Sequence, residues 1–128
     1  MSRLIVTEFL TLDGVIEAPG FEEHRDGKNA WALRLQTPEM QDFFRDQLSK
    51  VGAFLLGRTT YQIWAAFWPT AGGDADVAKQ MNDAAKYVVS NTLKGADWAN
   101  STVLSGDWAA RVADLKRVNE ILEGCQAR

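Results

Sequence analysis

Four short apolar segments, separated by stretches with helical periodicity, constrain the fold of this chain most strongly. They are too short and too rich in β-branched residues to be helices, so they predict strands. Their positions are 3–10, 53–56, 86–90 and 102–105. Because most are joined by helical crossovers, they predict an α/β domain with a largely parallel sheet. The length of 128 residues fits one domain over 1–128.

The segments between the strands carry loop and helix signals. The first strand is apolar almost throughout, which predicts a central strand covered on both faces. The stretch 13–31 is rich in turn dipeptides and is expected to be a binding loop or lid. Thr37 is the expected N-cap of a helix over 38–50, with Pro38 at its first position. Further helices are predicted from Thr59 or Thr60 to Pro69, from Asp76 to Ala85, and from the N-cap Asp107 to Gly124.

The charge and the rare residues exclude several classes of protein. A net charge of −3 without a block of lysines or arginines argues against a nucleic-acid partner. The single cysteine, Cys125, excludes an internal disulfide, and the single histidine, His24, argues against a zinc site or a histidine-based catalytic pair. No apolar run approaches the roughly 18 residues of a membrane span, and the first residues lack the signal-peptide pattern. We therefore expect a cytoplasmic protein without membrane or nucleic-acid partners.

Residues 57–60, GRTT, leave the second predicted strand and enter a helix. A glycine at this point lets a ligand approach the backbone, and the N–H groups at a helix start favour a phosphate. Arg58 adds a fork of donors for a phosphate monoester, so the stretch would suit the pyrophosphate and 2′-phosphate of a dinucleotide. Ser90-Asn91-Thr92 follows the next strand, and parallel strands end at one edge of the sheet.

Both stretches also have an ordinary structural interpretation. A threonine at 59 or 60 is a common N-cap, Gly57 is a common turn residue, and Arg58 could be a solvated charge. A Ser-Asn pair after a strand is usually a turn. From the pattern alone, the choice between a phosphate site and a helix cap stays open.

Four motifs occur in an order that is typical of one superfamily. They are VTEFLTLDGVIEAPG, AFLLGRTTYQIW, KYVVSNTL and ADWANSTVLSGD, the last with a tryptophan before a strand. Spread over most of residues 1–117, they resemble the dihydrofolate reductase superfamily. The branch they resemble holds the reductase domain of the bifunctional riboflavin-biosynthesis deaminase/reductase and small stand-alone proteins similar to it. The resemblance implies a three-layer dihydrofolate reductase-like domain with a mostly parallel central sheet.

The same resemblance implies an NADPH-dependent reductase acting on a small heterocycle of the pyrimidine or pteridine type. The GRTT residues would hold the pyrophosphate and the 2′-phosphate, and the Ser-Asn pair would flank the adenosine end. The loop after the first strand would close over the nicotinamide. The implied cofactor-binding residues are Thr7, Val15, Ile16, Gly57, Arg58, Thr59, Thr60, Ser90, Asn91 and Thr92.

Reduction also needs a proton source, for which carboxylates near the first strand and first helix are candidates: Glu8, Asp13, Glu17 and Asp42. Asp42 and Asp13 are the predicted catalytic residues, because dihydrofolate reductases use a carboxylate at a place similar to Asp42 to contact the pteridine. Asp42 could instead be a solvated helix residue, and Asp13 an Asp-Gly turn residue. Three aromatic residues could wall a substrate pocket or belong to the core: Trp64, Phe67 and Trp68.

The carboxyl-terminal segment departs from the superfamily pattern. Its members continue after an LKR-type helix into a Gly-Gly motif, a strand, a helix and a β-hairpin, whereas LKR at 115–117 is followed here by VNEILEGCQAR. We therefore expect the C-terminal strands to be missing or diverged, and an exposed sheet edge to recruit a second copy as a homodimer. Three alternatives stay open: a non-catalytic dimeric remnant with partial or no nucleotide binding, an unrelated α/β module, and a gene product longer than this chain.

Overall fold

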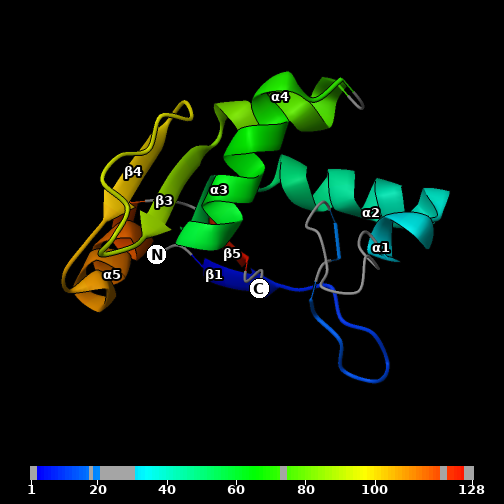
Figure 1. Ribbon diagram of the computed structural model, residues 1–128, viewed down its shortest axis with the longest axis horizontal. Helices are drawn as coiled ribbons and strands as arrows, with labels where there is room; N and C mark the ends of the chain where they lie inside the picture. The colour runs from blue at the N-terminus through cyan, green and yellow to red at the C-terminus, as the bar shows by residue number, and fades with distance from the viewer. Residues whose placement is uncertain (1–2, 18, 21–30, 73–74, 119–120, 126–128) are drawn as a thin grey trace.

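A five-stranded parallel sheet forms the centre of the computed structural model, which describes residues 3–17, 19–20, 31–72, 75–118 and 121–125 (Figure 1). The strands are β1 (Arg3–Thr7), β2 (Ala53–Gly57), β3 (Ala85–Val89), β4 (Ser101–Leu104) and β5 (Ile121–Cys125). They lie in the order β1-β5-β2-β3-β4, and every neighbouring pair is parallel. The predicted α/β class is confirmed, and all described strands end at the same edge of the sheet.

Helices connect the strands and cover both faces of the sheet. They are α1 (Trp31–Arg34), α2 (Pro38–Ser49), α3 (Arg58–Phe67), the 3-10 helix η1 (Trp68–Thr70), α4 (Ala75–Asp83) and α5 (Trp108–Val118). The chain moves across the sheet in one direction from β1 to β2 and β3, so right-handed crossovers place α2, α3 and α4 on one face. It moves back from β4 to β5, so the same rule places α5 on the opposite face. Figure 1 shows α5 on the side of β3 and β4 away from α3. The three-layer architecture is therefore confirmed.

The core lies between the β2–β3 part of the sheet and helices α3 and α4. Phe54, Leu56 and Val88 point into it from the strands and are almost completely buried. Trp64 of α3 packs edge-on against Phe54, with 5.6 Å between the ring centroids, and Trp68 packs against the same cluster. These two tryptophans therefore belong to the margin of the core.

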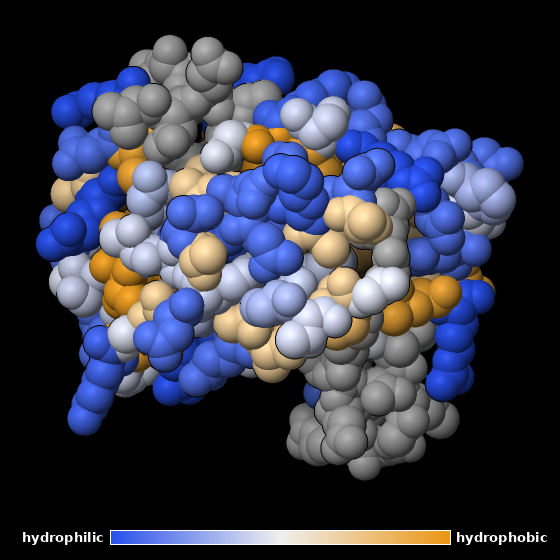
Figure 2. Space-filling view, turned by 90° about the horizontal axis from the view of Figure 1, so that it is seen from above, coloured by the Kyte–Doolittle hydropathy of each residue, from blue (hydrophilic) through white to orange (hydrophobic). Residues whose placement is uncertain are grey.

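The face of the molecule seen in Figure 2 is mostly polar. No helix in the described part of the chain is both long and apolar enough to cross a membrane. In the view of Figure 2, from above Figure 1, hydrophilic residues predominate and hydrophobic residues form small separate groups.

β1 is an edge strand, and the prediction of a covered central strand is wrong. Among the described residues it pairs only with β5, and Leu4, Ile5 and Val6 are 38%, 37% and 68% exposed. The strand also ends at Thr7 rather than near residue 10. A continuous apolar run gives the same signal at the edge and at the centre of a sheet, so it cannot fix the place of a strand.

The segment after α5 is the clearest correction. The helix predicted to reach Gly124 ends at Val118, and residues 121–125 form β5 between β1 and β2. Leu122 continues the helical spacing, but a short apolar run fits a strand equally well by periodicity. Pairing with a strand on each side decides in favour of β5. The central strands have therefore not lost a neighbour, and the edges of the described sheet are β1 and β4.

The remaining elements differ from the predictions only at their ends, apart from α1, which was not predicted. Two predicted N-caps are confirmed: Thr37 Oγ1 accepts the N–H of Met40, and Asp107 Oδ1 accepts that of Ala110. The predicted cap of α3 is wrong, because this helix begins at Arg58 with Gly57 as its N-cap. The greater part of the predicted loop 13–31, His24 included, lies outside the described residues.

Candidate functional site

The ends of β2 and β3 bring the two predicted polar stretches together. Arg58, the first residue of α3, donates a hydrogen bond from Nη1 to Oγ1 of Thr92 at 3.1 Å. The two residues are 34 positions apart along the chain, and the parallel pairing of β2 with β3 makes them neighbours. A guanidinium and a hydroxyl therefore lie together at the carboxyl edge of the sheet, both exposed to solvent.

The side chains before Thr92 shape the loops at this edge. Ser90 Oγ accepts the backbone N–H groups of Thr92 at 3.2 Å and Leu93 at 3.0 Å, which forms a turn after β3. Asn91 Oδ1 accepts the N–H of Gly106 at 2.9 Å and so joins this turn to the loop after β4. The Ser-Asn pair therefore forms a turn, and this turn holds Thr92 beside the guanidinium of Arg58.

The start of α3 carries no side-chain cap. The N-cap of this helix is Gly57, in extended conformation. A Cβ at Gly57 would meet no atom within 4 Å, so a ligand can approach the backbone there. Thr59 is exposed, whereas Thr60 is almost completely buried. An uncapped helix start beside Arg58 fits a phosphate group, with Thr59 as the accessible hydroxyl.

A pocket of about 330 Å³ opens at the carboxyl end of β1. Its lining comes from the end of β1, from α1 and from α2: Thr7, Glu8, Phe9, Leu10, Trp31, Ala32, Leu35, Met40, Phe43 and Phe44. Phe9 and Phe44 pack with their ring centroids 5.2 Å apart, and Phe43 meets Phe44 edge-on at 6.0 Å. Figure 1 shows α1 and α2 at the opposite end of the molecule from β4 and α5. The walls are therefore mainly aromatic and aliphatic.

The pocket and the start of α3 lie along one edge of the sheet. β5 is the only strand between β1 and β2 in the described sheet. Parallel strands lie about 4.8 Å apart, so the ends of β1 and β2 are about 10 Å from each other. One extended ligand can therefore reach from the start of α3 to the mouth of the pocket.

The other predicted site residues lie at three separate places. Thr7 lines the pocket. Asp42 lies on the exposed side of α2, outside the pocket lining, with Oδ1 2.9 Å from Nη1 of Arg45. Asp13 accepts a hydrogen bond from the Thr11 hydroxyl, which also accepts the N–H of Val15 at 2.8 Å. This turn fixes the start of the loop that continues through Ile16.

Sequence reasoning missed the aromatic walls of the pocket. Phe43 and Phe44 occupy helical spacing in α2, and such residues are expected in a core rather than at an open pocket. Phe9 lies beyond the end of β1, inside the range predicted as strand. Phe43 is exposed, which distinguishes a residue at an open pocket from a core residue. This exposure follows from the fold and cannot be seen in the sequence.

A buried cation lies apart from both features, at the start of β3. Lys86 is fully buried and its Nζ donates to three backbone carbonyl oxygens at 2.8 to 2.9 Å: those of Asn82, Ala84 and Ala99. The amino group also lies 4.1 Å from the centroid of the Trp98 ring. Burial lowers the pKa of Lys86 to about 8, and the nearby Asp83 carboxylate acts in the opposite direction. All three donors are used, so this lysine joins α4 to the β3–β4 connection as a structural group.

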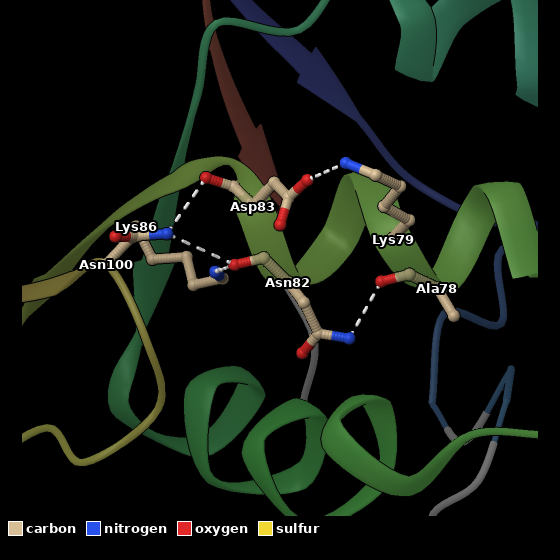
Figure 3. Close-up of polar contacts among 6 residues, drawn as sticks. All are labelled: Ala78, Lys79, Asn82, Asp83, Lys86 and Asn100. Carbon is tan, nitrogen blue, oxygen red and sulfur yellow. Dashed lines mark hydrogen bonds and ion pairs between the residues drawn. The ribbon is translucent and has the colours of Figure 1, made fainter.

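Neighbouring polar contacts extend this connection (Figure 3). Asn100, at φ 60°, donates from Nδ2 to the carbonyl oxygens of Asn82 at 3.4 Å and Asp83 at 3.0 Å. Trp98 is held from two sides, because its ring N–H donates to Asn82 Oδ1 at 2.7 Å and its backbone N–H to Tyr61 Oη at 3.0 Å. The ADWANS motif therefore serves the structure, and within the described residues no cluster of three potential ligands suits a metal ion.

Comparisons with known proteins give a family and a fold. The chain matches the model of the RibD C-terminal domain family over residues 2–122. Its structure is similar to the crystal structure of a protein named for riboflavin biosynthesis from Shewanella sp. PV-4, with 21% sequence identity and a TM-score of 0.60. That match covers 94% of this chain and 61% of the other, so this chain spans about three fifths of that protein's length. Curated protein sequences give no significant match.

Proposed function

Because the chain belongs to the RibD C-terminal domain family, we propose that it is an NADPH-dependent reductase of a small heterocyclic substrate, of the pyrimidine or pteridine type. The observation that carries the proposal is the placement of a phosphate-binding geometry and an apolar pocket on one edge of the sheet. A dinucleotide cofactor needs both, because its phosphates must be held while its reactive ring meets the substrate.

The cofactor would be held mainly by the ends of β2 and β3. Arg58 would hold the 2′-phosphate, since a guanidinium forms two parallel bonds to such a group. The N–H groups at the start of α3 would bind the pyrophosphate, which approaches closely because position 57 is a glycine. The turn Ser90–Thr92 would flank the adenosine end, and bound NADPH would supply a hydride to the substrate.

The nicotinamide and the proton source belong to the β1 side. Thr7, Val15 and Ile16 would contact the nicotinamide end of the cofactor. Asp13 and Asp42 are the proposed proton donors for the reduced atom. Replacing either aspartate by asparagine should lower kcat by at least roughly 100-fold with little change in NADPH affinity, because general acid catalysis contributes factors of this size. Steady-state kinetics with each variant tests the two roles separately.

We also propose that the protein is a cytoplasmic homodimer in which a second copy covers the exposed apolar strand β1. An edge strand with exposed Leu4, Ile5 and Val6 offers a partner apolar side chains and a backbone edge along which no second described strand lies. The mass of the chain in solution tests this part of the proposal independently of cofactor binding.

The experiment that tests the function is a calorimetric titration of the chain with NADPH and with NADH. Arg58→Ala should weaken NADPH binding by roughly 10- to 100-fold, because a hydrogen-bonded ion pair to phosphate is lost, and should leave NADH binding almost unchanged. Arg117→Ala is the matched control, since this exposed arginine pairs with Asp114 on α5, at 3.2 Å, and lies away from the ends of β2 and β3.

Each result of the titration has a definite meaning. Micromolar NADPH binding that depends on Arg58 supports the proposal. A folded chain that binds neither nucleotide overturns it. Binding without turnover of any pyrimidine or pteridine tested would favour the alternative of a non-catalytic remnant that has kept its nucleotide site.

A further inference from the structure

Trp108, the first residue of α5, is the most exposed tryptophan of the chain. It is 54% exposed, whereas Trp31, Trp64 and Trp68 are half-buried and Trp98 is buried. Tryptophan is usually well buried, because its ring carries a large apolar area. Within the described structure, no ring contact and no hydrogen bond holds the indole of Trp108. The indole is therefore open to a planar ligand.

Hydrogen bonds join Trp108 to the turn that faces Arg58. Asn91 Oδ1 accepts the N–H of Gly106 at 2.9 Å, and the carbonyl oxygen of Gly106 accepts the N–H of Trp108 at 2.9 Å. The residue after Asn91 is Thr92, whose hydroxyl accepts the guanidinium of Arg58. The start of α5 is therefore fixed beside the arginine proposed to bind a phosphate.

The direction of α5 places the indole at the carboxyl edge of the sheet. The helix begins shortly after β4 ends at Leu104, and helical side chains lean toward the N-terminus of their helix. Strand β4 is the neighbour of β3, and parallel strands lie about 4.8 Å apart. The guanidinium of Arg58 reaches the turn after β3, so Trp108 belongs to the next strand connection along the same edge.

A nucleotide with a phosphate on its 2′ oxygen matches this arrangement. The base and the 2′ oxygen are attached to adjacent carbons of the ribose, so a phosphate held by Arg58 leaves the base one ribose ring away. Bases stack on aromatic side chains, and tryptophan offers the largest such surface. The nearby Asp107 carboxylate accepts the N–H of Ala110 at 3.1 Å. It would repel a second phosphate but not a neutral base.

We infer that Trp108 stacks on the base of a purine nucleotide whose 2′-phosphate is held by Arg58. The inference rests on the proposed function for the identity of this nucleotide as NADPH. It adds a binding residue after β4 to those proposed after β2 and β3. Asn91 is then a positioning residue, because its hydrogen bond to Gly106 holds the loop that carries Trp108.

Two probes test the inference by calorimetry on the whole chain: adenosine 2′,5′-bisphosphate and inorganic pyrophosphate, which has no base. Trp108→Ala should weaken binding of the bisphosphate by at least roughly 10-fold, because stacking of one base contributes a factor of this size. Trp108→Phe should recover most of the affinity. Binding of pyrophosphate should be the same in both variants. Arg117→Ala, in the last turn of α5, is the matched control and should change neither probe.

Fluorescence gives a readout that a purely structural role would not change. The bisphosphate should quench tryptophan emission in the wild type and not in Trp108→Phe, while both proteins still bind it. Unchanged affinity of the bisphosphate in Trp108→Ala would overturn the inference. So would an equal loss for pyrophosphate, because the role of Trp108 would then not involve the base. A change in the mass in solution with unchanged affinity would assign the indole to a contact between copies and also overturn it.

The same samples are titrated with NADPH to separate the two proposals. NADPH binding that depends on Arg58 but not on Trp108 would keep the reductase proposal and overturn the stacking role. Binding of the bisphosphate that depends on Trp108, together with no binding of NADPH, would do the reverse. Chemical denaturation of Trp108→Ala checks that the variant is folded, as expected for an exposed residue.

Discussion

The two halves of the sheet are built in different ways. On the β2–β4 side, polar side chains and backbone groups are linked around a buried core, and Lys86, at the amino end of β3, donates to three carbonyl oxygens. On the β1 side, the strand is exposed and the pocket between β1 and α2 is lined mainly by apolar residues. The comparison indicates that one half is closed by buried polar contacts, while the other half exposes apolar side chains.

The largest effect is expected from the buried cation on the β2–β4 side. Lys86→Met keeps the length of the side chain but leaves three carbonyl oxygens without their donor, one in a buried contact and two in partly buried contacts. Each such loss costs about 1 to 3 kcal/mol, so the free energy of unfolding should fall by about 3 kcal/mol or more. Chemical denaturation measures this. Lys79→Met, which breaks only the exposed pair with Asp83, should change it by less than about 1 kcal/mol. Similar losses of unfolding free energy in both variants would mean that the buried contacts of Lys86 add no more stability than an exposed ion pair.

The same lysine predicts a dependence of stability on pH. Burial lowers its pKa to about 8 in the folded chain, whereas an unfolded lysine keeps its proton to about pH 10.4. Between these two values the unfolded chain binds more protons, so this group makes the folded state more stable as the pH rises. The difference in unfolding free energy between the wild type and Lys86→Met should therefore widen from pH 7.5 to pH 10. A narrowing would mean that the carbonyl oxygens and the Trp98 ring outweigh burial.

A smaller loss is expected where one buried hydrogen bond is removed. Tyr61→Phe leaves the buried backbone N–H of Trp98 without its acceptor and should cost about 2 kcal/mol. Tyr87→Phe on β3 is the control, because the described structure gives the Tyr87 hydroxyl no hydrogen bond. Thermal or chemical unfolding of both variants measures the difference. Equal changes would show that the hydroxyl of Tyr61 adds nothing to the β2–β4 side.

The two halves also differ in how far the sequence predicts them. Gly57 ends β2, Arg58 follows it, and Thr92 lies shortly after β3. A parallel sheet is therefore enough to bring the two strand ends together, and Arg58 is hydrogen-bonded to Thr92. The pocket depends on how α1 and α2 lie against the end of β1, which no local pattern encodes. β5 was missed for a related reason, since its short apolar run becomes a strand only through pairing with β1 and β2.

Gly57→Ala separates a ligand effect from a structural one. The new Cβ meets no protein atom within 4 Å, so the unfolding free energy should change by no more than about 1 kcal/mol, the usual effect at an N-cap. NADPH binding should weaken by at least roughly 10-fold, because the methyl group occupies the space through which the pyrophosphate would approach the backbone. Calorimetry on the folded variant measures this. Unchanged affinity would exclude a close approach at this glycine.

The smallest effect on stability is expected at the open edge. Val6 is largely exposed, so Val6→Lys should alter the unfolding free energy of a single chain by less than about 0.5 kcal/mol. If a second copy covers β1, the charge should nevertheless convert a dimer into a monomer, which the mass in solution reports. Thr102→Lys, at an exposed position on the opposite edge strand β4, is the matched control and should leave the mass unchanged. A mass in solution that is the same in both variants would exclude β1 as the interface. A large loss of stability in Val6→Lys would mean that other residues of the same chain cover β1.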